Sequence, residues 1–318
     1  IMSLFSKLFG SKTNESSVST NKLYPVMLSS IYDKTRLIEN NKYYIQPKYD
    51  GIRVLFYYDS TQNSKIVSRN YIDITSKYHD IKKIKLSDHI NNCILDCELI
   101  SNSFTNLMKI NDNNKYNLIV FDILVLNNKE TFGLEYESRL ALLEQNIPKD
   151  NLLISMIQTK IITYNGMNIN PDDLLQDYNE YEGTIIKSNS PYEFKRSFES
   201  MKLKRKYSLD LLIIGRIKKL DKRYKDMFNV FIMGIRDNDN KIIEICKVSS
   251  GLTEEEIKEI NKLLDMDKEV ILEIEYQSIT NTNNKISLRF PVVVKIRYDK
   301  TKEDINTLKD LDSIKYNI

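Results

Sequence analysis

Short apolar runs separated by turn-forming residues fill the first two thirds of the chain. Residues 43–47 and 52–58 are rich in aromatic and β-branched side chains and flank Gly51, which predicts a strand, a tight loop and a second strand, with Lys48 at the junction. The other elements predicted here are strands at 64–69, 93–100, 116–126, 153–164 and 183–188, and helices at 138–145 and about 171–178. Strands with a few helices between them indicate an α+β fold.

The pattern changes after Lys206. Thr253 and Glu256 have the spacing of a capping box and open a predicted helix. The apolar face of this helix consists of Ile257, Ile260, Leu263 and Leu264. Strands are predicted at 209–217, 228–236 and 241–248 before the helix, and at 270–278 and 286–296 after it. Three strands, a helix and two strands is the element order of an OB-like β-barrel, so we expect a boundary between residues 206 and 207.

The beginning of the chain has a different composition. Residues 11–22 are polar and rich in Ser, Thr and Asn, and such a segment cannot offset the entropy of ordering by burial. We therefore expect a flexible leader at 1–22, an α+β domain at 23–206 and a barrel domain at 207–318. No segment has the pattern of a signal peptide or the length of a membrane span, so we expect a soluble, unexported protein without a membrane partner.

Composition narrows the functional classes. A chain of 318 residues with 41% hydrophobic and 29% charged residues can bury two cores, and its net charge of +3 permits a nucleic-acid partner without requiring one. Three cysteines without metal-ligand spacing and two histidines argue against a zinc site. Unpaired thiols are typical of reducing compartments, here the cytoplasm or nucleus. Abundant Asn, Ile and Lys are compatible with a viral or phage protein acting in a host cell.

Lys48 is the first candidate for chemistry, in the run Lys-Tyr-Asp-Gly-Ile-Arg at 48–53. An ammonium with a pKa of about 10.4 is a poor nucleophile, so a reactive lysine needs neighbours that favour its neutral form. Lys202 and Lys204 lie two residues apart in a predicted strand and share a face, where they can hold a phosphate and repel a proton from Lys48. A solvated edge strand is the plainer interpretation of that lysine pair.

Carboxylates and one aromatic residue complete the candidates. Asp96 and Glu98 share a face of a predicted strand, and Glu182 precedes another strand. Carboxylate oxygens suit Mg²⁺, which usually also binds substrate phosphates. These residues also have interpretations without a chemical role. Asp96 and Glu98 would then be solvated carboxylates on a half-buried strand, and Phe121 would be a core residue of its apolar segment.

These candidates belong to one ordered series. It runs through residues 48–53, Ser68-Arg69-Asn70, Asp96-Cys97-Glu98-Leu99, Phe121-Asp122, Glu182-Gly183, Met201-Lys202-Leu203-Lys204, Arg289-Phe290-Pro291 and Arg297-Tyr298-Asp299-Lys300. The series resembles the covalent nucleotidyltransferases, a superfamily of DNA ligases, RNA ligases and mRNA capping enzymes, and most of all a small ATP-dependent DNA ligase of the viral or phage type. The resemblance implies an ATP-grasp-like adenylation domain of antiparallel sheets with helices, followed by an OB-fold barrel.

The resemblance also implies residue roles. Its catalytic positions are Lys48, Asp50, Arg53, Lys202 and Lys204. Its nucleotide-binding positions are Gln46, Lys48, Arg53, Arg69, Glu98, Phe121, Lys202, Lys204, Arg289, Arg297 and Lys300. Glu182 and Glu98 would organise Mg²⁺, with Mn²⁺ as an alternative. Lys48 would attack the α-phosphate of ATP to form a lysyl-AMP.

The function implied is the sealing of 3′-OH/5′-phosphate nicks in duplex DNA during repair, replication or recombination, by a monomer that consumes ATP. Three alternatives stay open, which are a GTP-using mRNA guanylyltransferase, an RNA ligase and a non-catalytic protein that binds nucleic-acid ends. Some small viral ligases carry a DNA-encircling latch between the second and third barrel strands. Only residues 237–240 separate those predicted strands here, so we expect no latch.

Overall fold

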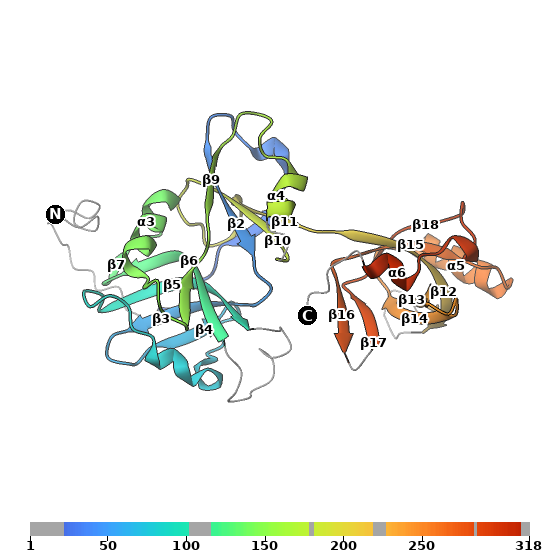
Figure 1. The fold of residues 1–318 in the computed structure, drawn as a ribbon, viewed down its shortest axis with the longest axis horizontal. Coiled ribbons are helices and arrows are strands. Elements are labelled where there is room, and N and C mark those ends of the chain that lie inside the picture. The colour runs from blue at the N-terminus through green and yellow to red at the C-terminus, as the bar shows by residue number, and fades with distance from the viewer. Residues whose placement is uncertain (1–21, 102–115, 178–180, 219–226, 283–284, 313–318) are drawn as a thin grey trace. The chain divides into compact units, whose positions relative to one another are not determined.

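The computed structural model describes residues 22–101, 116–177, 181–218, 227–282 and 285–312 (Figure 1). The chain divides into two compact units, Ile1–Lys204 and Arg205–Ile318. Both units consist mostly of sheet with few helices. The predicted leader lies outside the described residues except for Lys22. Within the described parts of the chain, none of the helices is long and apolar enough to span a membrane.

The described residues of unit 1 form two sheets. The first has the order β1-β11-β10-β2-β9, with β1 and β11 parallel and the other neighbours antiparallel. Its strands are β1 (Leu28–Ile31), β2 (Lys42–Lys48), β9 (Lys160–Thr163), β10 (Gly183–Ser188) and β11 (Arg196–Lys204). The second has the order β4-β3-β5-β6-β7, and β8 pairs in parallel with β6. Its strands are β3 (Ile52–Asp59), β4 (Lys65–Ser68), β5 (Asn92–Ser101), β6 (Tyr116–Leu126), β7 (Lys129–Glu130) and β8 (Ile154–Met156).

Two details of the predicted sheets were wrong. The pairs β1–β11 and β6–β8 are parallel, so the sheets are not purely antiparallel. The single strand predicted at 153–164 is two strands in different sheets, because β8 pairs with β6 whereas β9 pairs with β2. The chain crosses from one sheet to the other at residues 157–159, which brings this segment close to both. An apolar run carries no signal for such a crossing.

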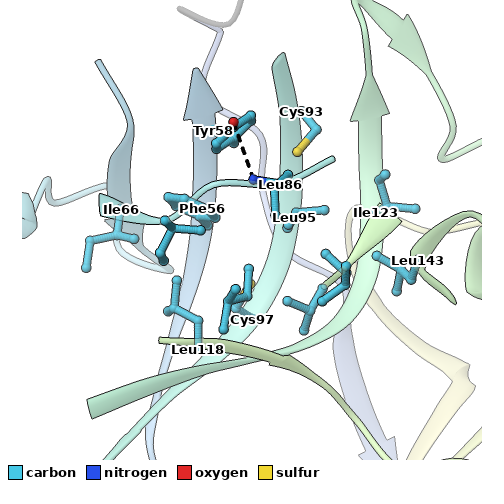
Figure 2. Packing of buried hydrophobic residues seen from close by; sticks show 14 of the residues in the cluster. Phe56, Tyr58, Ile66, Leu86, Cys93, Leu95, Cys97, Leu118, Ile123 and Leu143 are labelled. Carbon is cyan, nitrogen blue, oxygen red and sulfur yellow. Dashed lines mark hydrogen bonds between the residues drawn. The ribbon is translucent and has the colours of Figure 1, made fainter. Parts of the chain in front are cut away.

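The main core of unit 1 lies on one face of the second sheet (Figure 2). Phe56 and Tyr58 point to this face from β3 because residues two apart in a strand share a face, and Leu95 and Cys97 do so from β5. Leu143 contributes from helix α3 (Tyr136–Asn146). The backbone N–H of Leu86 donates to the Tyr58 hydroxyl at 3.4 Å. The remaining helices of the unit are α4 (Pro171–Asp177) and the 3₁₀ helices η1 (Lys34–Arg36), η2 (Thr75–Lys77) and η3 (His79–Lys83).

Unit 2 is built on a five-stranded sheet with the order β14-β13-β12-β15-β18. Thr253 caps α5 and forms the predicted capping box with Glu256, and Ile257 and Ile260 are buried. The strands are β12 (Tyr207–Ile217), β13 (Val230–Arg236), β14 (Ile242–Val248), β15 (Ile271–Tyr276), β16 (Ser278–Thr282), β17 (Lys285–Arg289) and β18 (Val292–Ile296). The helices are α5 (Glu254–Asp265), η4 (Lys302–Asp304) and α6 (Leu308–Asp312).

The last two predicted strands each divide in two. β15 and β18 pair within the main sheet, whereas β16 and β17 form a separate two-stranded sheet. Phe290 has a φ of 54° and Pro291 has no backbone N–H, which explains the break between β17 and β18.

A short turn connects β13 to β14. Its Asp237 N–H donates to the carbonyl of Lys241 at 2.8 Å, and Asn240 has a φ of 64°. The prediction that no latch is inserted between these strands is therefore confirmed. The three cysteines are buried and unpaired, as expected.

Candidate active site

Strand register brings two candidate lysines to the same end of the first sheet. Gly183 is paired with Lys48 on β2 on one side and with Lys204 on β11 on the other. The backbone N–H of Glu182 donates to the Lys48 carbonyl at 3.0 Å. A Cβ atom on Gly183 would collide with the carbonyl oxygen of Leu203, so the close approach of β10 to β11 requires glycine here.

The Glu182 carboxylate lies between the two ammonium groups. Lys48 Nζ donates to its Oε2, and Lys204 Nζ forms an ion pair with its Oε1. The Glu182 side chain is 6% exposed, against 22% for Lys48 and 33% for Lys204. Burial raises the pKa of Glu182, but the two lysines outweigh burial and hold it below its ordinary value. The carboxylate is thus buried and ionised while both cations reach solvent.

Lys202 lies on β11 beside this cluster. Burial, and then repulsion by the ammonium groups of Lys204 and Lys48, lowers its pKa. Met201 is buried and Leu203 packs against a core cluster, which is the alternation expected of this strand. The plain solvated edge strand is therefore not the environment of these lysines: Lys202 and Lys204 are both partly buried, and β11 lies between β1 and β10.

Glu98 lies under the loop that joins β2 to β3. The backbone N–H of Gly51 donates to its Oε1 at 3.1 Å, and a Cβ on Gly51 would collide with the carbonyl of Leu99. Burial raises the pKa of Glu98 to about 7, although the positive charges of Lys48 and Arg53 oppose this shift. Asp50 is half-buried in the same loop.

Arg53 makes a two-pronged ion pair with Asp96. Its Nε and Nη2 donate to the two carboxylate oxygens at 2.9 and 2.6 Å, and the Tyr192 hydroxyl donates to Asp96 at 2.6 Å. Asp96 is fully buried, so it is not the solvated carboxylate of the alternative interpretation. Two of the three guanidinium nitrogens of Arg53 are therefore committed to a protein partner, which leaves Nη1 as its remaining donor group.

Phe121 is not a core residue. Asp96 is paired with Asp122 and Cys97 with Val120, so Phe121 is the extra residue of a β-bulge in β6. Its two neighbours are buried, whereas Phe121 itself is only half-buried. The Arg53 guanidinium lies 5.1 Å and the Lys187 ammonium 5.0 Å from its ring centre. The bulge thus presents this ring beside the charged residues instead of in the core.

A buried cluster centred on Asp122 was not predicted from the sequence. Arg139 donates to both of its carboxylate oxygens, at 2.7 and 3.2 Å, and Lys187 Nζ lies 3.3 Å from Oδ2. Burial raises the pKa of Asp122, but the two cations outweigh it and lower the pKa overall. Burial lowers the pKa of Lys187 to about 8, with Asp122 opposing the shift. Lys187, which follows Ile185 and Ile186 in β10, was the available signal.

Gln46 is buried on β2, two residues before Lys48, so the two side chains leave the strand on the same side. Its amide nitrogen lies 2.6 Å from the Tyr136 hydroxyl and 2.9 Å from Thr159 Oγ1. Arg69 lies in the exposed turn after β4.

The predicted cations of unit 2 are held within that unit. Arg297 Nη1 donates to both oxygens of Asp210 at 2.8 and 2.9 Å, and Lys300 Nζ donates to the same carboxylate at 2.5 Å. Arg297 also donates to Asp299 at 2.9 and 2.7 Å. The Arg289 guanidinium lies 5.0 Å from the ring centre of Phe290.

The donor set suits a metal only in part. Among the described residues, no group of three His, Cys, Asp or Glu side chains could hold an ion. Glu182 and Glu98 offer single carboxylates, and Glu182 is bound to two lysines. Mg²⁺ commonly binds through one or two carboxylates with substrate phosphates supplying other ligands, so these residues fit an ion that arrives with a nucleotide.

Comparison with known families identifies this arrangement. A model described as "ATP dependent DNA ligase domain" matches residues 26–204, more than half of the 318, and a model described as "ATP dependent DNA ligase C terminal region" matches 224–300. The sequence of unit 1 is therefore that of an ATP-dependent DNA ligase domain. The chain belongs to the ATP-dependent DNA ligase family.

Curated relatives are DNA ligases. DNA ligase 1 of Methanosarcina mazei is 27% identical over 341 residues, which cover 85% of this chain and 58% of that protein. A DNA ligase of Methanococcus aeolicus is 28% identical over 331 residues, which cover 88% of this chain and 55% of that protein. The chain thus spans little more than half the length of these relatives.

Solved structures share the fold. One named Pmar-Lig_PreS3 superimposes with a TM-score of 0.67 at 19% identity, covering 87% of this chain and 68% of that one. A structure from a study of Lig E DNA ligases, concerned with DNA binding by a minimal scaffold, gives a TM-score of 0.60 at 16% identity, covering 87% of this chain and all of that one. At these identities the matches show a shared fold.

Proposed function

We propose that this chain seals nicks in duplex DNA at the expense of ATP, through a lysyl-AMP at Lys48. The observation that carries the proposal is the position of Lys48 at the end of β2, in one cluster with Glu182 and Lys204. Membership of the DNA ligase family supplies the reaction class. The catalytic set is Lys48, Asp50, Arg53, Lys202 and Lys204.

We propose a domain division that follows from this function, with adenylation at 23–206 and an OB-fold at 207–318. Support for a barrel comes from β17, which pairs with β16 and also approaches β14, where Lys285 Nζ lies 3.8 Å from Glu244. Since β18 continues from β17 and pairs with β15, the last hairpin bridges both edges of the sheet. That is how a five-stranded barrel closes.

In the first step Lys48 Nζ, as the neutral amine, attacks the α-phosphorus of ATP. A nitrogen–phosphorus bond forms while the bond to pyrophosphate breaks, and pyrophosphate leaves. AMP then passes to the 5′-phosphate of the nick, and the 3′-hydroxyl displaces it to form the phosphodiester. Charge neutralisation and positioning supply most of the catalysis in phosphoryl transfer.

Lys202, Lys204 and Arg69 are the cations that we assign to phosphate. Lys202 and Lys204 follow each other on one strand face next to Lys48, and the arriving phosphate competes with Glu182 for Lys204. Mg²⁺ bound with the nucleotide would neutralise phosphate charge, and Glu182 and Glu98 are the residues that would hold it, with Mn²⁺ as a substitute. Gln46, Glu98 and Phe121 would contact the nucleoside, and Arg53 would contact a phosphate.

Unit 2 contributes Arg289, Arg297 and Lys300 in this proposal. Arg297 and Lys300 share Asp210, so each can exchange one anionic partner for a phosphate. Such an exchange requires the second unit to approach the nucleotide and later leave so that DNA enters, a motion common in enzymes whose sites close over substrate.

Duplex DNA is the proposed partner of a monomer that acts inside the cell, where its substrate is. Lys195 and the exposed Arg196, which begins β11 and donates to the Ser29 carbonyl at 2.7 Å, are the candidate backbone contacts in the described residues. Lysines neutralise DNA phosphates independently of base sequence. The other basic pairs suggested by the sequence, at 218–219 and 222–223, lie largely outside the described residues.

Labelling tests this function. The wild type and a Lys48→Ala variant are incubated with Mg²⁺ and α-labelled ATP or GTP, chased with nicked duplex DNA or nicked duplex RNA, and then separated under denaturing conditions. We expect label from ATP only, absent from the variant and discharged by the nick. Label from GTP would indicate a guanylyltransferase, discharge only by nicked RNA would indicate an RNA ligase, and no label would leave a binding protein.

A further inference from the structure

One hydrogen-bond chain links the candidate base-binding residues and has no assigned role. Tyr136, at the start of α3, is fully buried and donates its hydroxyl proton to the Phe121 carbonyl at 3.0 Å. The same hydroxyl oxygen lies 2.6 Å from the Gln46 amide. Lys187 Nζ also donates to the Phe121 carbonyl, at 3.2 Å. Tyr136 therefore touches both the strand of the reactive lysine and the bulge that presents the Phe121 ring.

The chemistry of this chain fixes the orientation of an amide. A tyrosine hydroxyl has one proton, and a carbonyl oxygen can only accept. Since Tyr136 gives its proton to the Phe121 carbonyl, its oxygen can only accept from Gln46. The Gln46 group facing Tyr136 must then be the NH₂, which also reaches Thr159 Oγ1 at 2.9 Å. The amide oxygen, Oε1, is consequently directed away from both partners as an acceptor.

The geometry points to Tyr136 as the positioning residue for purine selectivity, because it holds Gln46 with its amide oxygen presented to the base edge. The inference rests on the proposed use of ATP. An acceptor complements the 6-amino group of adenine and opposes the 6-oxo group of hypoxanthine or guanine, whose oxygen also only accepts. A site that matches hydrogen-bonding groups rejects a mismatched analogue more strongly than one that matches only shape.

Removal of the Tyr136 hydroxyl should free the amide to turn. In a Tyr136→Phe variant nothing obliges the NH₂ to face the ring, so the Gln46 amide can present either group to a base. We expect loss of the preference for ATP over ITP, which differs from ATP at the 6-position and at N1, without loss of the reaction itself. The ratio of kcat/KM for self-labelling with the two nucleotides should fall about tenfold, equivalent to about one buried hydrogen bond.

The experiment measures labelling by α-labelled ATP and ITP in four proteins. Wild-type labelling by ATP is required first, and its absence would refute the proposed function and not this inference. Tyr44→Phe is the matched control, because its ring contacts Tyr136 with centroids 5.1 Å apart while its buried hydroxyl has no hydrogen-bond partner in the described residues. Its ATP/ITP ratio should equal that of the wild type.

Rescue separates positioning from general damage. In the double variant Tyr136→Phe/Gln46→Glu, both carboxylate oxygens accept, so orientation no longer matters and the ATP preference should return. If Tyr136→Phe slows both nucleotides equally, or if the double variant fails to recover the ratio, Tyr136 is only structural and the inference is wrong. Should Tyr136→Phe not fold, Gln46→Leu removes the presented amide oxygen itself, and an unchanged ATP/ITP ratio in that variant would equally overturn the inference.

Discussion

Two carboxylates in unit 1 are each held by two cations, yet their surroundings differ. Asp122, Arg139 and Lys187 are 0%, 1% and 6% exposed, so this cluster is sealed inside the protein. Glu182 is equally buried at 6%, but its partners Lys48 and Lys204 are 22% and 33% exposed. Each cluster thus consists of one carboxylate and two cations. The cluster around Asp122 is closed to solvent, whereas the two lysines around Glu182 reach solvent.

The difference separates a structural cluster, around Asp122, from the cluster that we propose to be reactive, around Glu182. Cations that reach solvent can exchange a carboxylate for an incoming phosphate. Arg139 and Lys187 cannot do so, because leaving Asp122 would leave buried charges without a partner. Lys187 and Arg139 hold the bulge and α3 in place, and Lys48 and Lys204 stay available.

The largest expected effect is on stability, from Asp122→Asn. The substitution keeps the shape but leaves two buried cations without their anion, which costs about 3–5 kcal/mol of unfolding free energy. Urea unfolding measures the change. Asp177→Asn is the control, because Asp177 pairs with Lys160 at the surface and its loss should cost less than about 1 kcal/mol. Equal effects of the two substitutions would remove the distinction between the clusters.

Glu182→Gln should lower activity much more than it lowers stability, unlike Asp122→Asn. Its partners can turn to water, so we expect an unfolding free energy within about 1–2 kcal/mol of the wild type. Self-labelling by ATP should fall by about 10²–10³-fold, the loss typical of one charge-stabilising group. The matched control is Glu137→Gln. Glu137 pairs with Lys42 at the surface, and Lys42 lies on the same strand as Lys48, so this variant should leave labelling unchanged. A large loss of stability with full labelling would contradict this assignment.

Gly183→Ala tests whether strand register holds the open cluster. The new Cβ must push β10 from β11 and so part Glu182 from Lys204, with an expected cost of about 1–3 kcal/mol and slower labelling. Nothing lies within 4 Å of a Cβ placed on Gly133, so Gly133→Ala serves as the control. If both variants unfold at the same urea concentration and label at the same rate, strand register does not hold Glu182 beside Lys204.

The smallest expected effect is a pH dependence from Glu98, a partly buried carboxylate that has no cation in hydrogen-bond contact among the described residues. Burial raises its pKa to about 7, so the folded protein retains a proton that the unfolded chain loses. Its contribution to stability is therefore present below its ordinary pKa and lost as the pH rises towards about 7. From about pH 5 to 7 the wild type should lose about 1–2 kcal/mol relative to Glu98→Gln in urea unfolding. A constant difference would show that Glu98 is ionised throughout.

The strands near Lys48 could be predicted from the sequence because local patterns determine them. The turn at Gly51, the alternation of Met201 to Lys204 and the capping box of α5 all depend on neighbours within a few residues. Phe121 illustrates the limit, since a bulge appears only when β5 and β6 are paired. In an apolar run its sequence position fits a core residue as well as an exposed ring.

Long-range partners explain the remaining gaps. Tyr136 lies 90 residues from Gln46, and Lys187 lies 65 residues from Asp122. No spacing rule connects such pairs, and a lone lysine in β10 carries no indication of its partner. The crossing between β8 and β9 and the breaks at β16 and β17 likewise depend on which strand each half meets.

Mapping the covalent adduct tests the central claim most directly. The protein is incubated with ATP and Mg²⁺, and digested peptides are sequenced by mass spectrometry under conditions that preserve a phosphoramidate. We predict one adenylyl group, on Lys48, and none on Lys202, Lys204 or Lys187. An adenylyl group on another lysine, or its persistence in Lys48→Ala, would contradict the assignment of Lys48 as the nucleophile.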